Sequence, residues 1–236
     1  MSAHLPDAEV THRSLDGVRI RIAGPHDLRR PCTSVARVAA GGRLHEISGG
    51  TRADALAWAE DVGVEGFDQE FGVQGGRLRV GRARSRDADT DTGVADPMLA
   101  AVWEGRRHAV FTHLYHARPA DAVAFFAALR LAEHEDGVTA ETRGRARRTG
   151  PAEAAKEIPG LGLLEITALT ARTRGRLPSW RGAPVAGGEL FRDTVEGQGP
   201  YFLLALDSLL VTVLPEEDRV REVPALLARL AVEVVR

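Results

Sequence analysis

The chain has 236 residues, of which 44% are hydrophobic and 27% are charged. These proportions are typical of a globular protein and argue against wholesale disorder, and the length suffices for one large domain or two small ones. The formal net charge of −2 gives no reason to expect a polyanionic partner from net charge alone.

Lysine is almost absent from this sequence. Lys156 is the one lysine among 31 basic residues, and Ala, Gly and Val are heavily used. This composition indicates a bacterium with a high-GC genome. An arginine cluster therefore carries less functional weight here than it would in a chain with balanced lysine use.

The sequence predicts a soluble, cytoplasmic protein that makes no membrane contact. Its single cysteine, Cys32, allows neither an intramolecular disulfide nor a cysteine-based zinc site. The first ten residues lack the basic start and apolar stretch of a signal peptide. No stretch approaches the ~18 consecutive apolar residues of a transmembrane helix.

The first part of the chain predicts hairpins and one helix. Residues 1–14 are expected to form a flexible tail. Apolar and charged residues alternate over residues 18–22, which predicts a strand, and Gly41-Gly42 centres a hairpin over residues 34–47. Thr51 is a suitable cap for a helix that ends near residue 62, and a second glycine hairpin follows over residues 67–82.

The middle of the chain carries the clearest strand–helix pattern. Residues 108–133 predict a long strand, a helix that opens on a proline, and a short extended exit. The helix has an apolar stripe of four residues, Ala122, Phe125, Phe126 and Leu129. The string ADAVAF at 120–125 resembles ADALAW at 53–58, which is compatible with a structural repeat and with chance in an Ala-rich chain.

The last part of the chain repeats this plan after an irregular region. Residues 139–156 have almost no large apolar side chain and predict an exposed loop or a frayed helix. Strands are expected over residues 164–173 and 189–194, and one or two buried strands over residues 201–214. A helix over residues 223–230 and a β-branched exit complete the chain.

These elements predict an α+β fold with a mainly antiparallel sheet built from hairpins and about three amphipathic helices packed on it. Residues 85–97 are polar, acidic and rich in turn formers, and they are the best candidate for a domain joint. After the tail, the chain then divides into two similar strand–helix halves, residues 15–97 and 98–236. One continuous domain is the alternative.

Two groups of residues suggest a metal site. Asp87, Asp89 and Asp91 have the alternate spacing of a calcium loop, but the EF-hand glycine and the twelfth-position glutamate are missing. His108 and His116 would lie roughly 26 Å apart on a strand, with His113 on its other face, so these histidines do not converge. A solvated acidic loop and non-ligating histidines are the favoured interpretations.

Arginine and tryptophan supply the candidates for partner binding. Residues 141–181 carry nine basic and four acidic residues, and a tryptophan flanked by arginine in a Pro/Gly segment resembles an interface anchor. A lid over the core and a solvated basic surface are the alternatives. The residues predicted to contact a partner are Trp180, Arg174, Arg176, Arg181, Arg145 and Arg147.

No enzyme signature is present in the sequence. The chain contains no phosphate-binding GxxxxGK[ST] loop and no GxSxG elbow, and GLGLLE at 160–165 lacks the third glycine of a dinucleotide loop. Cys32 would be a nucleophile only beside a histidine, and a buried inert thiol is the favoured interpretation. We expect no cofactor and no catalytic residues.

The first functional hypothesis is therefore a non-catalytic protein-binding or assembly module with a protein partner. The second is an enzyme that uses His, Asp and Glu from separate segments. The third is a protein that binds nucleic acid or phosphate through its arginine-rich loops. Few aromatic residues are interleaved with the arginines, which argues against a stacking platform for single-stranded nucleic acid.

Overall fold

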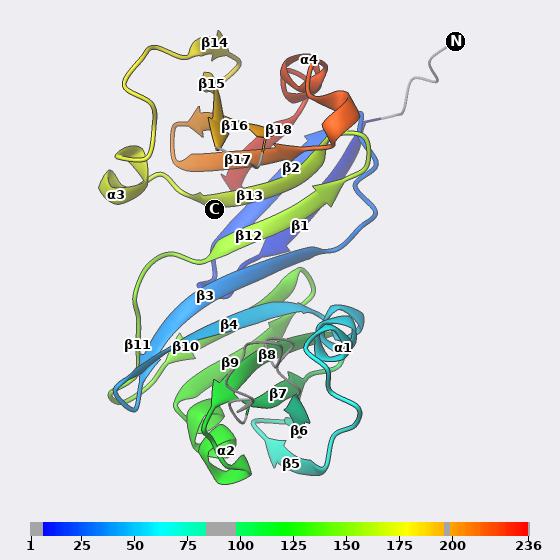
Figure 1. Cartoon of the computed structure of the whole chain (residues 1–236), viewed down its shortest axis with the longest axis vertical. Coiled ribbons are helices and arrows are strands. Elements are labelled where there is room, and N and C mark those ends of the chain that lie inside the picture. The colour runs from blue at the N-terminus through cyan, green and yellow to red at the C-terminus, as the bar shows by residue number, and fades with distance from the viewer. Residues whose placement is uncertain (1–6, 84–97, 196–198, 236) are drawn as a thin grey trace, which may run out of the picture. The chain divides into compact units, whose positions relative to one another are not determined.

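The computed structural model describes residues 7–83, 98–195 and 199–235, and its chain divides into two compact units (Figure 1). Unit 1 comprises Met1–His12, Val18–Cys32 and Ala152–Arg236. Unit 2 comprises Arg13–Gly17 and Thr33–Pro151. The predicted domain joint, residues 85–97, lies outside the described residues. The predicted division of the chain between residues 97 and 98 therefore stays a prediction.

Unit 2 consists mainly of antiparallel hairpins with two helices. Its elements are β3 (Cys32–Ala40, whose first residue belongs to unit 1), β4 (Arg43–Thr51), α1 (Arg52–Asp61), β5 (Gln69–Val73), β6 (Gly76–Ala83), β7 (Met98–Glu104), β8 (His108–Tyr115), α2 (Pro119–Ala127), β9 (Leu129–His134), β10 (Gly137–Thr142) and β11 (Arg147–Arg148).

The sheet of unit 2 has the strand order β3-β4-β8-β7-β6-β5. β11 pairs with β3, and β9 forms a separate hairpin with β10. The predicted Gly41-Gly42 turn is confirmed between β3 and β4, because both glycines adopt positive φ angles, 59° and 77°. This turn determines where the side chains at the start of β4 lie.

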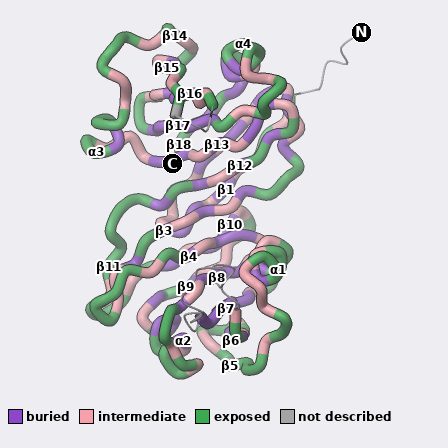
Figure 2. Tube along the Cα trace, in the orientation of Figure 1, coloured by how far each residue is buried: buried purple, intermediate pink, exposed green. Residues whose placement is uncertain are grey.

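Both helices of unit 2 begin where the sequence predicts them, but α2 ends at Ala127, and Leu129 of the predicted apolar stripe begins β9. Thr51 caps α1 in a capping box with Asp54, and Pro119 opens α2. Phe126 on α2 is completely buried. Every residue of β7 is buried, and purple sections mark the buried residues of this unit in Figure 2. These segments make up the core of the unit.

Unit 1 is built mainly from strands that come from both ends of the chain. Its elements are β1 (Ala8–Arg13, whose last residue belongs to unit 2), β2 (Arg19–Gly24), β12 (Glu153–Ile158), β13 (Gly162–Ala168), α3 (Ala171–Arg174), β14 (Ala183–Val185), β15 (Gly188–Val195), β16 (Gly199–Leu206), β17 (Leu209–Pro215), the 3-10 helix η2 (Glu217–Arg219), α4 (Val223–Leu227) and β18 (Ala231–Val235).

Apolar clusters hold unit 1 together. β12, β13, β17, β16, β15 and β14 pair in that order, and β18 pairs with β2. One cluster joins Ile22 of β2 to Ile166 of β13 and Val232 of β18. A second cluster contains Phe191, Leu203 and Leu210, and it is covered by apolar side chains from the segment around α3.

Part of each unit follows a similar order of elements. Two paired strands, a helix, four strands that pair as consecutive hairpin partners, a second helix and one further strand follow one another, but unit 2 continues with β10 and β11, and unit 1 also contains β1, β2 and η2. In unit 2 the strand order is β3-β4-β8-β7-β6-β5, and in unit 1 it is β12-β13-β17-β16-β15-β14. The strings at 53–58 and 120–125 lie in α1 and α2, which occupy different places in this order.

The structure corrects three predictions about the ends and the middle of the chain. Residues 8–13 of the predicted tail form β1. Residues 139–156 contain most of β10, all of β11 and the start of β12, so the predicted loop or frayed helix is wrong. Helix α4 ends at Leu227, which is earlier than the predicted end at residue 230.

The strand β12 has an unusual residue on its buried side. Its burial alternates along the strand, and Ala154, Lys156 and Ile158 are buried. The Lys156 ammonium donates hydrogen bonds to the carbonyl oxygens of Leu28, at 2.8 Å, and Arg30. The chain's one lysine therefore secures the irregular segment between β2 and β3, and burial lowers its pKa.

The α+β character and the predominance of antiparallel strands are confirmed. The described residues form four α-helices in place of about three, and α3 has only four residues. Among these helices, none is both long enough and apolar enough to cross a membrane.

Candidate functional site

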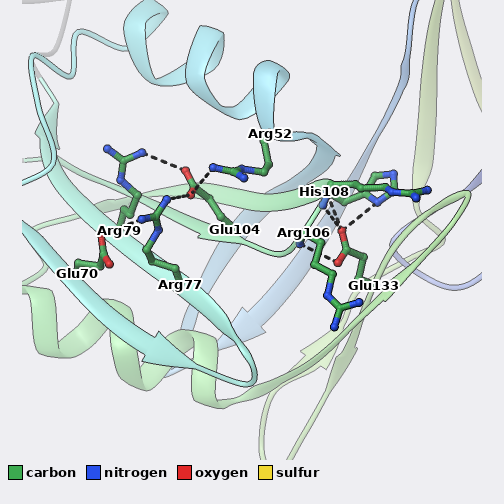
Figure 3. A network of polar contacts seen from close by, with 9 residues as sticks. Arg52, Glu70, Arg77, Arg79, Glu104, Arg106, His108 and Glu133 are labelled. Carbon is green, nitrogen blue, oxygen red and sulfur yellow. Dashed lines mark hydrogen bonds and ion pairs between the residues drawn. The ribbon is translucent and has the colours of Figure 1, made fainter.

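A buried carboxylate in unit 2 accepts hydrogen bonds from three arginines (Figure 3). The side chain of Glu104, at the end of β7, is only 3% exposed. Its oxygens accept hydrogen bonds from Arg77 at 2.8 Å, Arg79 at 3.1 Å and Arg52 at 3.4 Å. The alternation of β6 places Arg77 and Arg79 on one face, and Arg52 begins α1.

This cluster has a structural explanation. Burial acts to raise the pKa of Glu104, but the hydrogen bonds from Arg77 and Arg79 outweigh that effect and hold the pKa below its usual value. Arg79 also lies over the Phe67 ring, with its guanidinium carbon 4.2 Å from the ring centre. Arg77 and Arg79 therefore anchor β6 to β7.

A second carboxylate in Figure 3 accepts hydrogen bonds from a backbone turn. Glu133 of β9 accepts bonds from the backbone N–H groups of Arg106 at 2.8 Å, Arg107 at 2.6 Å and His108 at 2.8 Å. Burial acts to raise the pKa of Glu133, and these three bonds lower it below its usual value. The side chain thus joins β9 to the turn between β7 and β8.

We expect Glu133→Gln to destabilise the protein by about 1–3 kcal/mol, because an amide has one acceptor oxygen where the carboxylate has two. Urea unfolding followed by circular dichroism would measure this loss. Glu141→Gln is the matched control, because Glu141 is exposed and lies 3.9 Å from Arg130. Equal stability of the two variants would contradict the role given to Glu133.

A groove of about 470 Å³ lies elsewhere on unit 2. The β3–β4 turn, the end of β8 and the helix α2 form its walls. Its volume is within the range of small-molecule sites. Its polar lining comprises Arg43, His45, Tyr115, His116 and Asp121, and its apolar lining includes Leu114, Ala117, Ala124, Phe125 and Ala128.

Arg43 and His45 are held in place by their neighbours. The Arg43 guanidinium donates a hydrogen bond to the Tyr115 carbonyl oxygen at 2.9 Å. The His45 ring lies against the Phe125 ring, with 4.7 Å between their centres. Burial lowers the pKa of His45, and the positive charge of Arg43 lowers it further, so the imidazole is neutral at pH 7.

His116 has a backbone conformation that is rare for a residue with a side chain. Its φ angle is +52° at the turn from β8 to α2. A non-glycine residue in this region costs about 1–3 kcal/mol, and such residues concentrate at functional sites. The conformation places this exposed histidine at the wall of the groove.

The three histidines predicted not to converge lie in different surroundings. His108 is 3.5 Å from Glu133, His113 packs edge-on against Tyr115, and His116 lines the groove. Within the described ranges, no group of three or more His, Cys, Asp or Glu side chains could hold a metal ion. The calcium candidates Asp87, Asp89 and Asp91 lie outside these ranges.

The predicted partner-binding residues fall in both units. Trp180 in unit 1 is 54% exposed, and Arg174, Arg176 and Arg181 are exposed around it in the sequence. Arg145 and Arg147 are exposed in unit 2.

The segment that carries Trp180 is anchored on one side and open on the other. Thr170 caps α3, with its hydroxyl accepting from the Thr173 backbone N–H at 3.2 Å. Leu177 packs against the cluster of Phe191, Leu203 and Leu210. Figure 1 shows the segment running from α3 to β14, and Figure 2 shows it as largely exposed.

Cys32 is buried, with 8% of its surface exposed. It belongs to the main apolar cluster of unit 1. This environment agrees with the interpretation of Cys32 as a packed thiol.

The groove was not predicted from the sequence. The signal available was weak: a glycine turn followed by Arg43 and His45, and His116 three residues before the proline that opens the second predicted helix. Comparison of the chain with protein-family models, with curated proteins and with solved structures gave no match.

Proposed function

We propose that this protein is a non-catalytic binding module that docks an acidic surface of a protein partner on residues 171–182. The observation that carries the proposal is an exposed tryptophan, Trp180, on a segment whose other side is anchored to the sheet. Tryptophan and arginine dominate the binding energy of many protein interfaces.

Charge specifies the kind of partner. The segment ARTRGRLPSWRG contains four arginines and no acidic residue. Among the residues that the structure describes, none of these four forms an ion pair with a carboxylate within 4.0 Å. Their charge remains available to an acidic surface, which would accelerate association.

Anchoring favours tight binding. The capped α3 and the buried contact of Leu177 restrict the segment before a partner arrives. A restricted loop loses less conformational entropy on association than a free one. One tryptophan offers no row of stacking rings for single-stranded nucleic acid, so an acidic protein surface is the better match.

We expect Trp180→Ala to weaken binding of a selected acidic peptide at least about 30-fold, the effect of losing a hot-spot side chain. The peptide would be selected against the full chain from a library of acidic sequences, and its affinity measured by fluorescence anisotropy. Tyr115→Ala is the control, because Tyr115 is an exposed aromatic residue, at 49%, in unit 2.

Arg176→Gln should weaken the same peptide by a smaller factor and reduce the salt dependence of its affinity. Failure to select any acidic peptide, or unchanged affinity in Trp180→Ala, would overturn the proposal. Preferential binding of a single-stranded oligonucleotide that is lost in both variants would replace it with nucleic-acid binding.

We also infer that the two units are copies of one structural plan. Their common order of strands and helices supports this, as do the threonine caps of α1 and α3 and the prolines that open α2 and α4. In such a plan β10 and β2 are equivalent, because they pair with β9 and β18, the strands that follow α2 and α4.

A further inference from the structure

We propose that the groove between the β3–β4 turn and α2 binds a small organic carboxylate with an apolar body. This site is separate from the partner-binding segment of unit 1, and the inference does not depend on the proposed function. It rests on three features of the groove: its volume, the sign of its charge and its apolar lining.

The volume fits a small organic molecule. About 470 Å³ is enough for a ring-containing acid and is small for a folded partner. The apolar lining comes from Leu114 and from four residues of the turn and helix that follow, with Phe125 as its aromatic member. An apolar body buried there would lose contact with water, which favours binding.

The polar lining favours a negative head group. Arg43 supplies a permanent positive charge, and the bond to the Tyr115 carbonyl oxygen restrains its side chain. His45 is not a further donor, because a neutral imidazole has one N–H group and this ring is already hydrogen-bonded to the Ala40 backbone. The guanidinium of Arg43 is therefore the group that would bind a carboxylate.

The one carboxylate in the lining already has a partner. Asp121 accepts a hydrogen bond from the Arg118 backbone N–H at 2.8 Å, and the Arg118 side chain lies 3.3 Å from the same oxygen. These contacts belong to the first turn of α2. Arg43 of the lining and Arg118 beside it both act on this single carboxylate. The three side chains together carry a net positive charge, which a cationic ligand would not match.

Phenylacetate is the probe for this site, with phenethylamine as a probe of the same ring and opposite charge. Each would be titrated into the full chain at pH 7, and the resonances of His45, Phe125 and Ala124 followed by NMR. We expect saturable shifts with phenylacetate and a Kd on the order of 1 mM, as for other ligands of this size. Phenethylamine should produce no saturable shift.

Arg43→Gln should weaken phenylacetate binding at least about tenfold, the effect of losing a charged hydrogen bond. Arg130→Gln is the matched control, because Arg130 is an exposed arginine of unit 2 outside the groove lining. Asp121→Asn should leave the affinity equal or higher, because it removes a negative charge. Unfolding curves would confirm that each variant is folded.

Three results would overturn the proposal. The first is the absence of saturable shifts with phenylacetate, and the second is equal binding of phenethylamine. The third is unchanged affinity in Arg43→Gln. Saturable binding of inorganic phosphate in place of phenylacetate would also contradict it, because phosphate makes no use of the apolar lining.

Discussion

Phe126→Asp is expected to abolish folding of unit 2. Phe126 is completely buried in α2 and packs edge-on against Phe125, with 5.7 Å between the ring centres. Loss of a buried phenylalanine costs about 3–5 kcal/mol, and burial of an unpaired carboxylate adds several more. The total is comparable to the whole stability of a typical domain, about 5–15 kcal/mol.

Circular dichroism and urea unfolding of the full chain would measure the effect. Phe126→Leu, which keeps an apolar side chain, should cost only about 1–2 kcal/mol. His113→Ala should change stability by about 1 kcal/mol or less, because His113 is half-buried and its ring contact is with the exposed Tyr115. A native-like unfolding curve for Phe126→Asp would show that α2 does not belong to the core.

Glu104→Ala is expected to cost about 3–5 kcal/mol, the penalty for removing one partner from a buried charge cluster. The substitution removes the carboxylate that accepts hydrogen bonds from Arg52, Arg77 and Arg79. Arg79 keeps its contact with the Phe67 ring, which does not replace the lost acceptor. Urea unfolding at pH 7 gives the difference in the free energy of unfolding.

The acid dependence of stability provides a second measurement on Glu104. Its folded-state pKa lies below the ordinary value of 4.5, so the unfolded chain binds the proton more tightly. The stabilisation is complete above pH 4.5 and is lost as the pH falls through the folded-state pKa. Glu104→Ala should therefore remove part of the loss of stability seen as the pH falls below 4.5.

Glu70→Ala is the control for this cluster. Glu70 also pairs with Arg77, but at 3.6 Å and with 55% of its side chain exposed. An exposed pair contributes about 0–1 kcal/mol. Similar losses in Glu70→Ala and Glu104→Ala would show that burial of the Glu104 carboxylate is unimportant.

The elements that could be predicted from the sequence are those with a local signal. Gly41-Gly42 indicated a hairpin, and Thr51 and Pro119 indicated the starts of helices, because the chemistry of these positions depends on their immediate neighbours. The strand β12 was missed because its buried side carries Ala154 and Lys156 in place of large apolar residues. Small side chains give a weak alternating pattern.

The groove was beyond prediction for another reason. Its lining comes from residues 40–45 and 114–128, which are brought together by the pairing of β4 with β8. No local pattern in the sequence indicates that β4 pairs with β8. For Trp180 the Pro/Gly surroundings and the flanking arginine were compatible with an interface anchor and with a lid over the core, and the structure leaves the residue 54% exposed.

The discontinuity of unit 1 bears on how the chain folds during its synthesis. Residues 33–151 of unit 2 leave the ribosome as one stretch, whereas β2 of unit 1 pairs with β18 near the other end of the chain. At roughly 5–20 residues per second, β2 waits on the order of ten seconds for that partner. Unit 2 is thus positioned to fold first, while the edge of β2 that pairs with β18 remains unpaired until β18 has been synthesised.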